Sequence, residues 1–115
     1  MVAISTDGKV IVLGSYDNTI KMWSVESGEE IRTLTGHSGS VYSVAISADG
    51  KVIVSGSDNS TVKMWSVESG EEIRTFTGHS EQIENVAISA GGKVIVSGCW
   101  DKTIKIWKNM VILTF

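Results

Sequence analysis

Three residues in the last third of the chain belong to types that can activate a nucleophile. His79, Ser97 and Asp101 supply an imidazole, a hydroxyl and a carboxylate, the groups of a hydrolytic triad. The same groups suit a structural role, because a buried tryptophan N–H needs an acceptor, and a hydroxyl and an imidazole can relay that bond to a carboxylate. A near-copy of the set occurs 42 residues earlier, which favours a structural network over an active site. We therefore predict that the chain is not an enzyme.

The elements that position these residues are repeated along the chain. The thirteen residues KMWSVESGEEIRT stand at 21–33 and return unchanged at 63–75. Over a longer stretch, 29 of the 36 residues at 2–37 recur at 44–79. The chain is thus about two and three-quarter copies of one 42-residue unit, a period typical of propeller blades.

Each unit reads as four short strands separated by turns. In the second copy the predicted strands are 41–47, 51–57, 61–67 and 71–77. They are rich in Val, Ile, Thr and aromatic residues, and the segments between them carry Asp, Asn, Ser and Gly. Asp7-Gly8 and Asp49-Gly50 are strong signals for tight hairpins. The pattern predicts an all-β chain of four-stranded antiparallel meanders, and the consecutive apolar residues of several strands predict sheets covered on both faces.

Bulk properties exclude several classes of function. The 115 residues are 42% hydrophobic and 20% charged, with a formal net charge of −3. No basic patch is present, so we expect neither nucleic acid nor a membrane as a partner. The single cysteine, Cys99, excludes an intrachain disulfide and a cysteine-based zinc cluster, and we predict no metal site and no cofactor. Without a segment typical of a signal peptide or membrane span, we expect a cytoplasmic location.

A recurring motif points to a family. A Gly-His pair is followed by Ser-Gly in the second strand, by an Asp-containing turn and by a Trp six residues later. This pattern resembles the WD-repeat (Trp-Asp repeat) β-propellers, and it covers essentially the whole chain. The resemblance implies a structural network of His, Ser, Asp and Trp within each repeat. By position, its members are His79, Ser97, Asp101 and Trp107 in the third copy, His37, Ser55, Asn59 and Trp65 in the second, and Asp17 and Trp23 in the first.

The chain departs from the family pattern in its first two copies. Asn59 stands where Asp is expected, and Asp58 is one place out of register. Leu13 replaces the serine of the first copy, which also has no histidine. The first two networks therefore lack members that the third network has.

The resemblance divides the chain into blades at 1–35, 36–77 and 78–115. Propellers close with about four to eight blades, so three blades leave two apolar faces uncovered. We expect a homo-oligomer, with a dimer of two chains forming a six-bladed ring. The last strand has lost the edge charges of its counterpart, which predicts an oligomer edge at Val111, Leu113 and Phe115. The alternative is a fragment, relic or engineered derivative of a longer propeller, with no function of its own.

WD-repeat proteins usually act as rigid scaffolds that bind proteins or peptides, and the resemblance implies the same here. Binding residues are expected where the copies differ although the strands do not. The candidate partner-binding face comprises Tyr16, Asp58, Trp100, Tyr42, Glu84, Ser40 and Gln82. Drift among recently duplicated blades would also produce these differences. A sugar-binding propeller is a further alternative, but it would need an aromatic residue at the same place in every copy.

Overall fold

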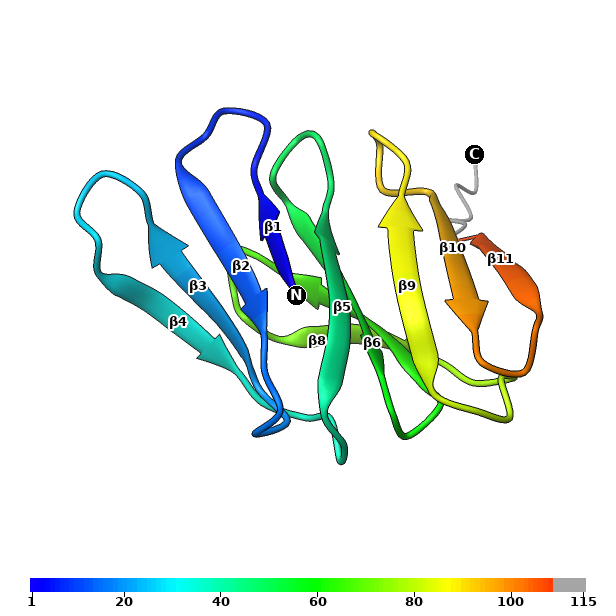
Figure 1. Ribbon diagram of the computed structural model, residues 1–115. Helices are drawn as coiled ribbons and strands as arrows, with labels where there is room; N and C mark the ends of the chain where they lie inside the picture. Colours follow the sequence, from blue (N-terminus) through cyan, green and yellow to red (C-terminus); the bar gives the residue numbers. More distant parts are fainter. Residues whose placement is uncertain (109–115) are drawn as a thin grey trace.

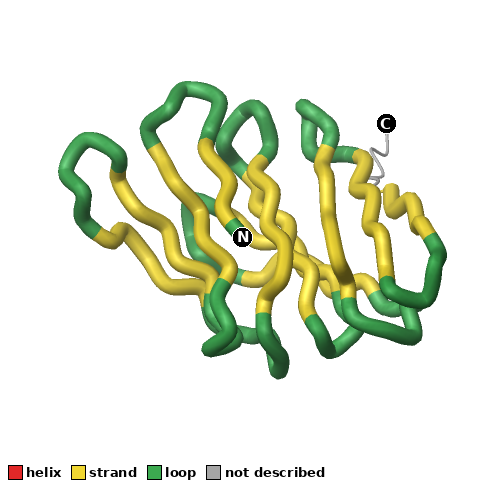
Figure 2. Tube along the Cα trace, in the orientation of Figure 1, coloured by secondary structure: helices red, strands yellow, loops and turns green. Residues whose placement is uncertain are grey.

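The computed structural model describes residues 1–108, and this part of the chain consists of strands and turns without a helix (Figure 2). The strands are β1 (Val2–Ile4), β2 (Val10–Gly14), β3 (Ile20–Ser24), β4 (Glu30–Leu34), β5 (Val41–Ile46), β6 (Val52–Ser57), β7 (Val62–Ser66), β8 (Glu72–Phe76), β9 (Ile83–Ile88), β10 (Val94–Cys99) and β11 (Ile104–Lys108). The prediction of an all-β chain is confirmed. Over the described residues, accordingly, no helix could span a membrane.

The strands form three antiparallel sheets that follow the sequence repeat. β1 to β4 make the first sheet, β5 to β8 the second, and β9 to β11 the described part of the third. Each strand pairs with the next one along the chain, as expected for meanders. The sheets lie side by side in an open row, with β4 at one end and β11 at the other (Figure 1). The fourth strand predicted for the third copy falls at 109–115, outside the described residues.

The predicted Asp-Gly turns form because both residues suit a tight connection. Gly8 adopts φ of 72° and Gly50 adopts φ of 73°, a left-handed conformation that glycine reaches at little cost. One carboxylate oxygen of Asp7 accepts hydrogen bonds from Ser5 Oγ (2.6 Å) and from the Lys9 N–H (2.9 Å). The second copy repeats these bonds around Asp49. The turns therefore fix the register of the first two strands in each of these sheets.

Neighbouring sheets pack face to face, and the core consists of the two junctions between them. At the first junction β1 and β2 pack on β5; at the second, β5 and β6 pack on β9. The first junction buries Val12, Ile20, Met22, Leu34, Val41, Val44, Ile53 and Trp65. The second buries Val54, Val62, Met64, Phe76, Ile83, Val86, Ile95 and Cys99. Each such large apolar side chain contributes about 1.5–3 kcal/mol when fully buried, so the junctions are the main source of stability.

The middle sheet is covered on both faces, whereas the outer sheets are covered on one. Residues 53–57 of β6 are all buried, in agreement with the expectation that this strand is covered on both faces. In β11 exposed and half-buried residues alternate. Three glycines at the same position of the repeat differ in the same way, according to whether a neighbouring sheet covers them. A Cβ on Gly14 would lie 2.8 Å from Val41 and one on Gly56 would lie 2.4 Å from Ile83, but one on Gly98 would meet nothing within 4 Å.

Candidate functional site

A Trp–Ser–His relay ties a loop to two strands in both the second and the third sheet. In the second sheet the Trp65 indole N–H donates to Ser55 Oγ (2.8 Å), and His37 Nε2 lies 2.6 Å from the same oxygen. In the third sheet the Trp107 indole donates to Ser97 Oγ (2.8 Å), with His79 Nε2 at 2.7 Å. Each histidine comes from the loop that enters its sheet, while Ser and Trp lie on neighbouring strands. The relay thus holds the loop against the sheet.

The third relay continues to the carboxylate of Asp101 in the β10–β11 turn. His79 Nδ1 lies 3.5 Å from Asp101 Oδ2 and 3.2 Å from the Thr103 hydroxyl. Asp101 Oδ1 accepts hydrogen bonds from the Thr103 N–H (2.9 Å) and from the Thr103 hydroxyl. The hydroxyl bond is the main reason that the pKa of Asp101 lies well below its ordinary value. All four residues assigned to this copy therefore lie together.

The second relay stops at the histidine. Asn59 turns its amide toward other partners: its nitrogen donates to Ser38 Oγ (2.6 Å) and its oxygen accepts from the Thr61 N–H (3.2 Å). His37 Nδ1 is buried without a hydrogen-bond partner. Burial, and secondly the nearby Lys63 ammonium, lowers the pKa of His37 from 6.5 to about 4. His37 is therefore neutral near pH 7, with one unsatisfied ring nitrogen.

The first sheet has only isolated parts of the network. The buried indole N–H of Trp23 has no partner, because Leu13 occupies the place of the accepting serine. Asp17 accepts hydrogen bonds from the hydroxyl and the N–H of Thr19 within its own turn. The hydroxyl bond is the main cause of the lowered pKa of Asp17. Asp17 and Trp23 are thus not joined to each other in the way that the third copy joins its members.

The His79–Ser97–Asp101 arrangement has the order of a hydrolytic triad but does not present its hydroxyl to a substrate. Ser97 is 0% exposed, and its oxygen already accepts the indole hydrogen bond. A nucleophile must reach the reacting atom at roughly 3 Å, which the covering strands prevent here. The geometry supports loop anchoring.

The residues predicted to face a partner gather around the ends of the strands, at the loops that connect and enter the sheets. We use the name loop face for this surface, composed of Tyr16, Ser40, Tyr42, Asp58, Gln82, Glu84 and Trp100. Tyr42, Gln82, Glu84 and Trp100 line one open pocket of about 350 Å³ between the second and third sheets. Trp100 is 61% exposed there. The pocket therefore combines two aromatic rings with a carboxylate and an amide.

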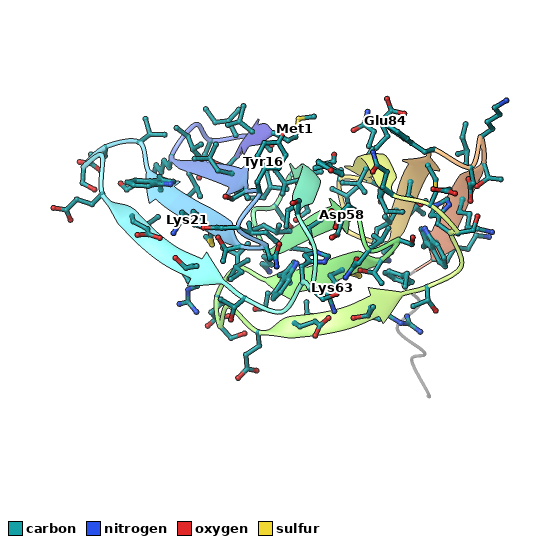
Figure 3. All side chains as sticks on the ribbon, turned by 60° about the horizontal axis from the view of Figure 1, so that its bottom comes forward. Met1, Tyr16, Lys21, Asp58, Lys63 and Glu84 are labelled. Carbon is teal, nitrogen blue, oxygen red and sulfur yellow. The ribbon has the colours of Figure 1, made fainter. Side chains whose placement is uncertain are left out.

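The rest of the loop face lies between the first and second sheets. Tyr16 and Tyr42 meet edge to face, with ring centroids 6.0 Å apart, beside a second pocket of about 250 Å³. Ser40 Oγ donates to the Tyr16 carbonyl (3.2 Å), and the Ser40 carbonyl accepts from the Asp58 N–H (3.0 Å). Tyr16, Asp58 and Glu84 follow one another across the three sheets in Figure 3. Tyr42 contributes to both pockets.

Some residues of the site were not predicted from the sequence. Met1, Ser15 and Val41 also line the pocket beside Tyr16. The turn threonines Thr19, Thr61 and Thr103 hold the acidic or amide residue two places before them. Their recurrence at one place in every copy was the signal that would have identified them. The predicted oligomer edge at Val111, Leu113 and Phe115 lies outside the described residues.

Comparison with known proteins gives a consistent result along the chain. The family model described as "WD domain, G-beta repeat" matches residues 2–24, 28–66 and 70–108. These matches include the relay residues of the second and third sheets. They cover most of the 115 residues.

Individual relatives match over one repeat at a time. "Dynein assembly factor with WD repeat domains 1" of Homo sapiens is 46% identical over 43 residues, which are 37% of this chain and 10% of the relative. "F-box/WD repeat-containing protein 7" of Drosophila melanogaster is 56% identical over 36 residues, 31% of this chain and 3% of the relative. The protein sel-10 of Caenorhabditis elegans, also an F-box/WD repeat-containing protein, is 50% identical over 34 residues, 30% of this chain and 6% of the relative. The matches thus span a tenth or less of these curated relatives.

Proposed function

Because the chain belongs to the WD-repeat family, we propose that it is a non-catalytic scaffold that binds a protein or peptide through its loop face. Proteins with WD repeats generally mediate protein–protein interaction. The observation that carries the proposal is the open pocket in which Tyr42 and Trp100 meet Glu84 and Gln82. Exposed aromatic rings are enriched among residues that dominate binding energy.

The pocket chemistry favours a cationic side chain on the partner. An aromatic face attracts an ammonium or guanidinium group, and the Glu84 carboxylate adds a charge partner. Asp58 places a further exposed carboxylate on the same face. The net charge of −3 also favours a basic partner over an acidic one. We therefore propose a peptide segment that contains Arg or Lys.

The test is a peptide array probed with the labelled full chain, followed by fluorescence anisotropy on the best binders. Bound peptides are expected to be enriched in Arg and Lys, and binding should weaken as salt is raised. Trp100→Ala should weaken binding by about 10-fold or more while sparing the fold, because the ring is largely exposed. Val25→Ala is the matched control, since Val25 is an exposed apolar residue in the turn at the opposite end of the strands. Equal binding by the two variants would contradict the proposal.

We also propose that two chains associate head to tail and close a six-bladed ring. The open face of the third sheet, formed by Val96, Ile104, Ile106 and Gly98, supports this idea. Ile104 is 75% exposed and Ile106 is 65% exposed. In sequence register these two residues correspond to Val62 and Met64, which are buried at the second junction.

The opposite end of the row offers the matching surface. Val2 and Ile4 on β1 are exposed, and they correspond to Val44 and Ile46 of the second sheet, which pack at the first junction. The two open faces are therefore equivalent to the two halves of a junction that the chain already forms. Burying them against a second copy would reuse the same complementarity.

Light scattering at micromolar concentration tests the ring. The folded chain should give about twice the chain mass of 12.4 kDa. Ile104→Lys should reduce that mass to a single chain, because a buried unpaired ammonium is costly. Ile31→Lys is the control, because the counterpart of Ile31 in the middle sheet, Ile73, stays 51% exposed although that sheet is covered on both faces. A folded wild-type monomer would instead favour a piece of a longer propeller, whose further blades cover these faces.

A further inference from the structure

We propose that the β10–β11 turn holds a divalent transition metal ion, best matched by Zn²⁺, on His79 Nδ1, Cys99 Sγ and a carboxylate oxygen of Asp101. The ligand atoms of these residues lie within 4.8 Å of one another. His79 and Cys99 are buried, and Asp101 is half-buried. One nitrogen, one sulfur and one oxygen ligand suit Zn²⁺, with water completing a four-coordinate site. This inference does not depend on a partner at the loop face.

The histidine is already oriented for coordination. Its Nε2 is engaged by Ser97 Oγ at 2.7 Å, and its Nδ1 is directed at the turn, where an ion would replace the Thr103 hydroxyl, 3.2 Å away, as its partner. Histidines that bind metals usually donate their other ring N–H to an oxygen acceptor. A serine oxygen has two lone pairs, so Ser97 can accept from His79 and Trp107 together. The relay thus supplies the orienting partner that a metal-bound imidazole requires.

The spacing of the nitrogen and oxygen ligands fits a bridging ion better than a direct bond. His79 Nδ1 and Asp101 Oδ2 are 3.5 Å apart. A charge-assisted hydrogen bond would bring them to about 2.7–2.9 Å. Two tetrahedral bonds of about 2.0–2.1 Å would separate them by roughly 3.3 Å. The other oxygen of Asp101 is fixed by the Thr103 N–H at 2.9 Å, so the carboxylate is held in place.

The thiol completes the ligand set. Cys99 Sγ donates to the Glu81 carbonyl at 3.2 Å and lies 3.5 Å from the Asp101 N–H. On binding, the thiol proton passes to solvent and the thiolate turns from the carbonyl to the ion. The Asp101 N–H remains as a hydrogen-bond donor to the sulfur. One thiolate and one carboxylate together balance the charge of a divalent cation.

The second sheet provides an internal comparison. There His37 occupies the place of His79, but Ser57 and Asn59 stand where the third sheet has Cys99 and Asp101. At both positions the third sheet has a strong zinc ligand, a thiol or a carboxylate, where the second sheet has a weak one, a hydroxyl or an amide. The three ligands do not form a metal-binding motif of closely spaced residues. They are spread over residues 79–101 and meet only because the entering loop packs on the β10–β11 turn. The sequence-based expectation of no metal site rested on the single cysteine, which excludes a cysteine cluster but not a mixed set of ligands.

The experiment is a titration of the reduced full chain with Co²⁺, an optical substitute for Zn²⁺. We expect saturation near one ion per chain, a thiolate-to-cobalt charge-transfer band, visible bands of a tetrahedral site, and displacement by Zn²⁺. Cys99→Ser should abolish the thiolate band, and Asp101→Asn should weaken affinity by about 10-fold or more. Both variants carry the residues found at these places in the second sheet, and circular dichroism checks their folding.

A second readout needs no variant. Cys99 is the only cysteine, so alkylation of the folded chain reports on this thiol alone. Bound Zn²⁺ should slow its alkylation, and a chelator should restore the original rate. Cobalt bands that lack the thiolate contribution, or alkylation unchanged by saturating Zn²⁺, would overturn the proposal.

Discussion

The second and third sheets have nearly the same residues in their central strands, but their environments differ. Trp65 is 1% exposed, whereas its counterpart Trp107 is only half-buried. Ser55 and Ser97 are both fully buried and accept the same indole hydrogen bond. The local relay is therefore set by the residues within a sheet and its entering loop. The depth of burial is set by the neighbouring sheet.

The largest expected effect comes from removing the central tryptophan of each relay. Trp65→Ala should lower the free energy of unfolding by about 3–5 kcal/mol, because it empties a fully enclosed site and leaves the Ser55–His37 pair without its donor. Trp107→Ala should cost clearly less, since part of its surface is already in solvent. Urea unfolding of the full chain measures both values. Equal losses would show that the relay, and not burial, dominates.

Protonation of His37 should make the stability of the chain depend on pH. The folded pKa of His37 is lowered to about 4, chiefly by burial, so the unfolded chain binds a proton between about pH 6.5 and pH 4 that the folded chain does not. Stability is therefore present above pH 6.5 and is lost as pH falls through this window, by about 2–3 kcal/mol. Urea midpoints across that range provide the measurement.

His37→Gln is the control for this pH dependence. Glutamine does not titrate, so the slope of stability against pH between 6.5 and 4 should flatten, whatever the variant costs at neutral pH. The lowered carboxylate pKa values of Asp7, Asp17 and Asp49 act in a lower range, because their stabilisation is lost only below about pH 4. An unchanged slope in the variant would assign the effect to other groups.

Much of the fold was predictable because the same strand and turn patterns occur in every copy of the repeat. The strand positions agree with the prediction to within a residue or two, since β-branched runs and Asp-Gly or Ser-Gly turns recur at one period. The membership of the His–Ser–Trp relay came from family resemblance. Spacing alone would not have joined His37 to Ser55, which are 18 residues apart and pair across a loop.

Other features depend on packing between loops and could not be predicted. The amide of Asn59 bonds to Ser38 in the loop that enters the sheet and to Thr61 in its own turn, and not to His37. Because Asn59 is engaged elsewhere, the buried Nδ1 of His37 has no hydrogen-bond partner. The convergence of Cys99 with Asp101 at His79 likewise requires the turn and the entering loop to meet. The change from Asp101 in the third copy to Asn59 in the second therefore alters the hydrogen bonds of the turn, although the strands of the two copies stay alike.

Asn59→Asp should make the second relay resemble the third. A carboxylate at this place can accept from His37 Nδ1, which has no partner now, while keeping the bonds to the Thr61 N–H. We expect the free energy of unfolding at pH 7 to rise by about 1 kcal/mol. The reciprocal Asp101→Asn should lower it by a similar amount, measured without metal in the presence of a chelator. A lower free energy of unfolding in both variants would contradict this prediction, because it would mean that the second copy is more stable with Asn and the third with Asp.

The smallest expected effect concerns the turn position that follows the acidic or amide residue. Asn18, Ser60 and Lys102 all have positive φ, at 75°, 70° and 67°. Asparagine tolerates this left-handed conformation better than serine does, so Ser60→Asn should raise the free energy of unfolding by about 0.5 kcal/mol. Ser69→Asn, in the turn after β7 but outside the set of positive-φ residues, should give no gain. Precise thermal unfolding resolves the two, and a gain confined to Ser60 would assign the effect to backbone strain, because both variants add the same amide.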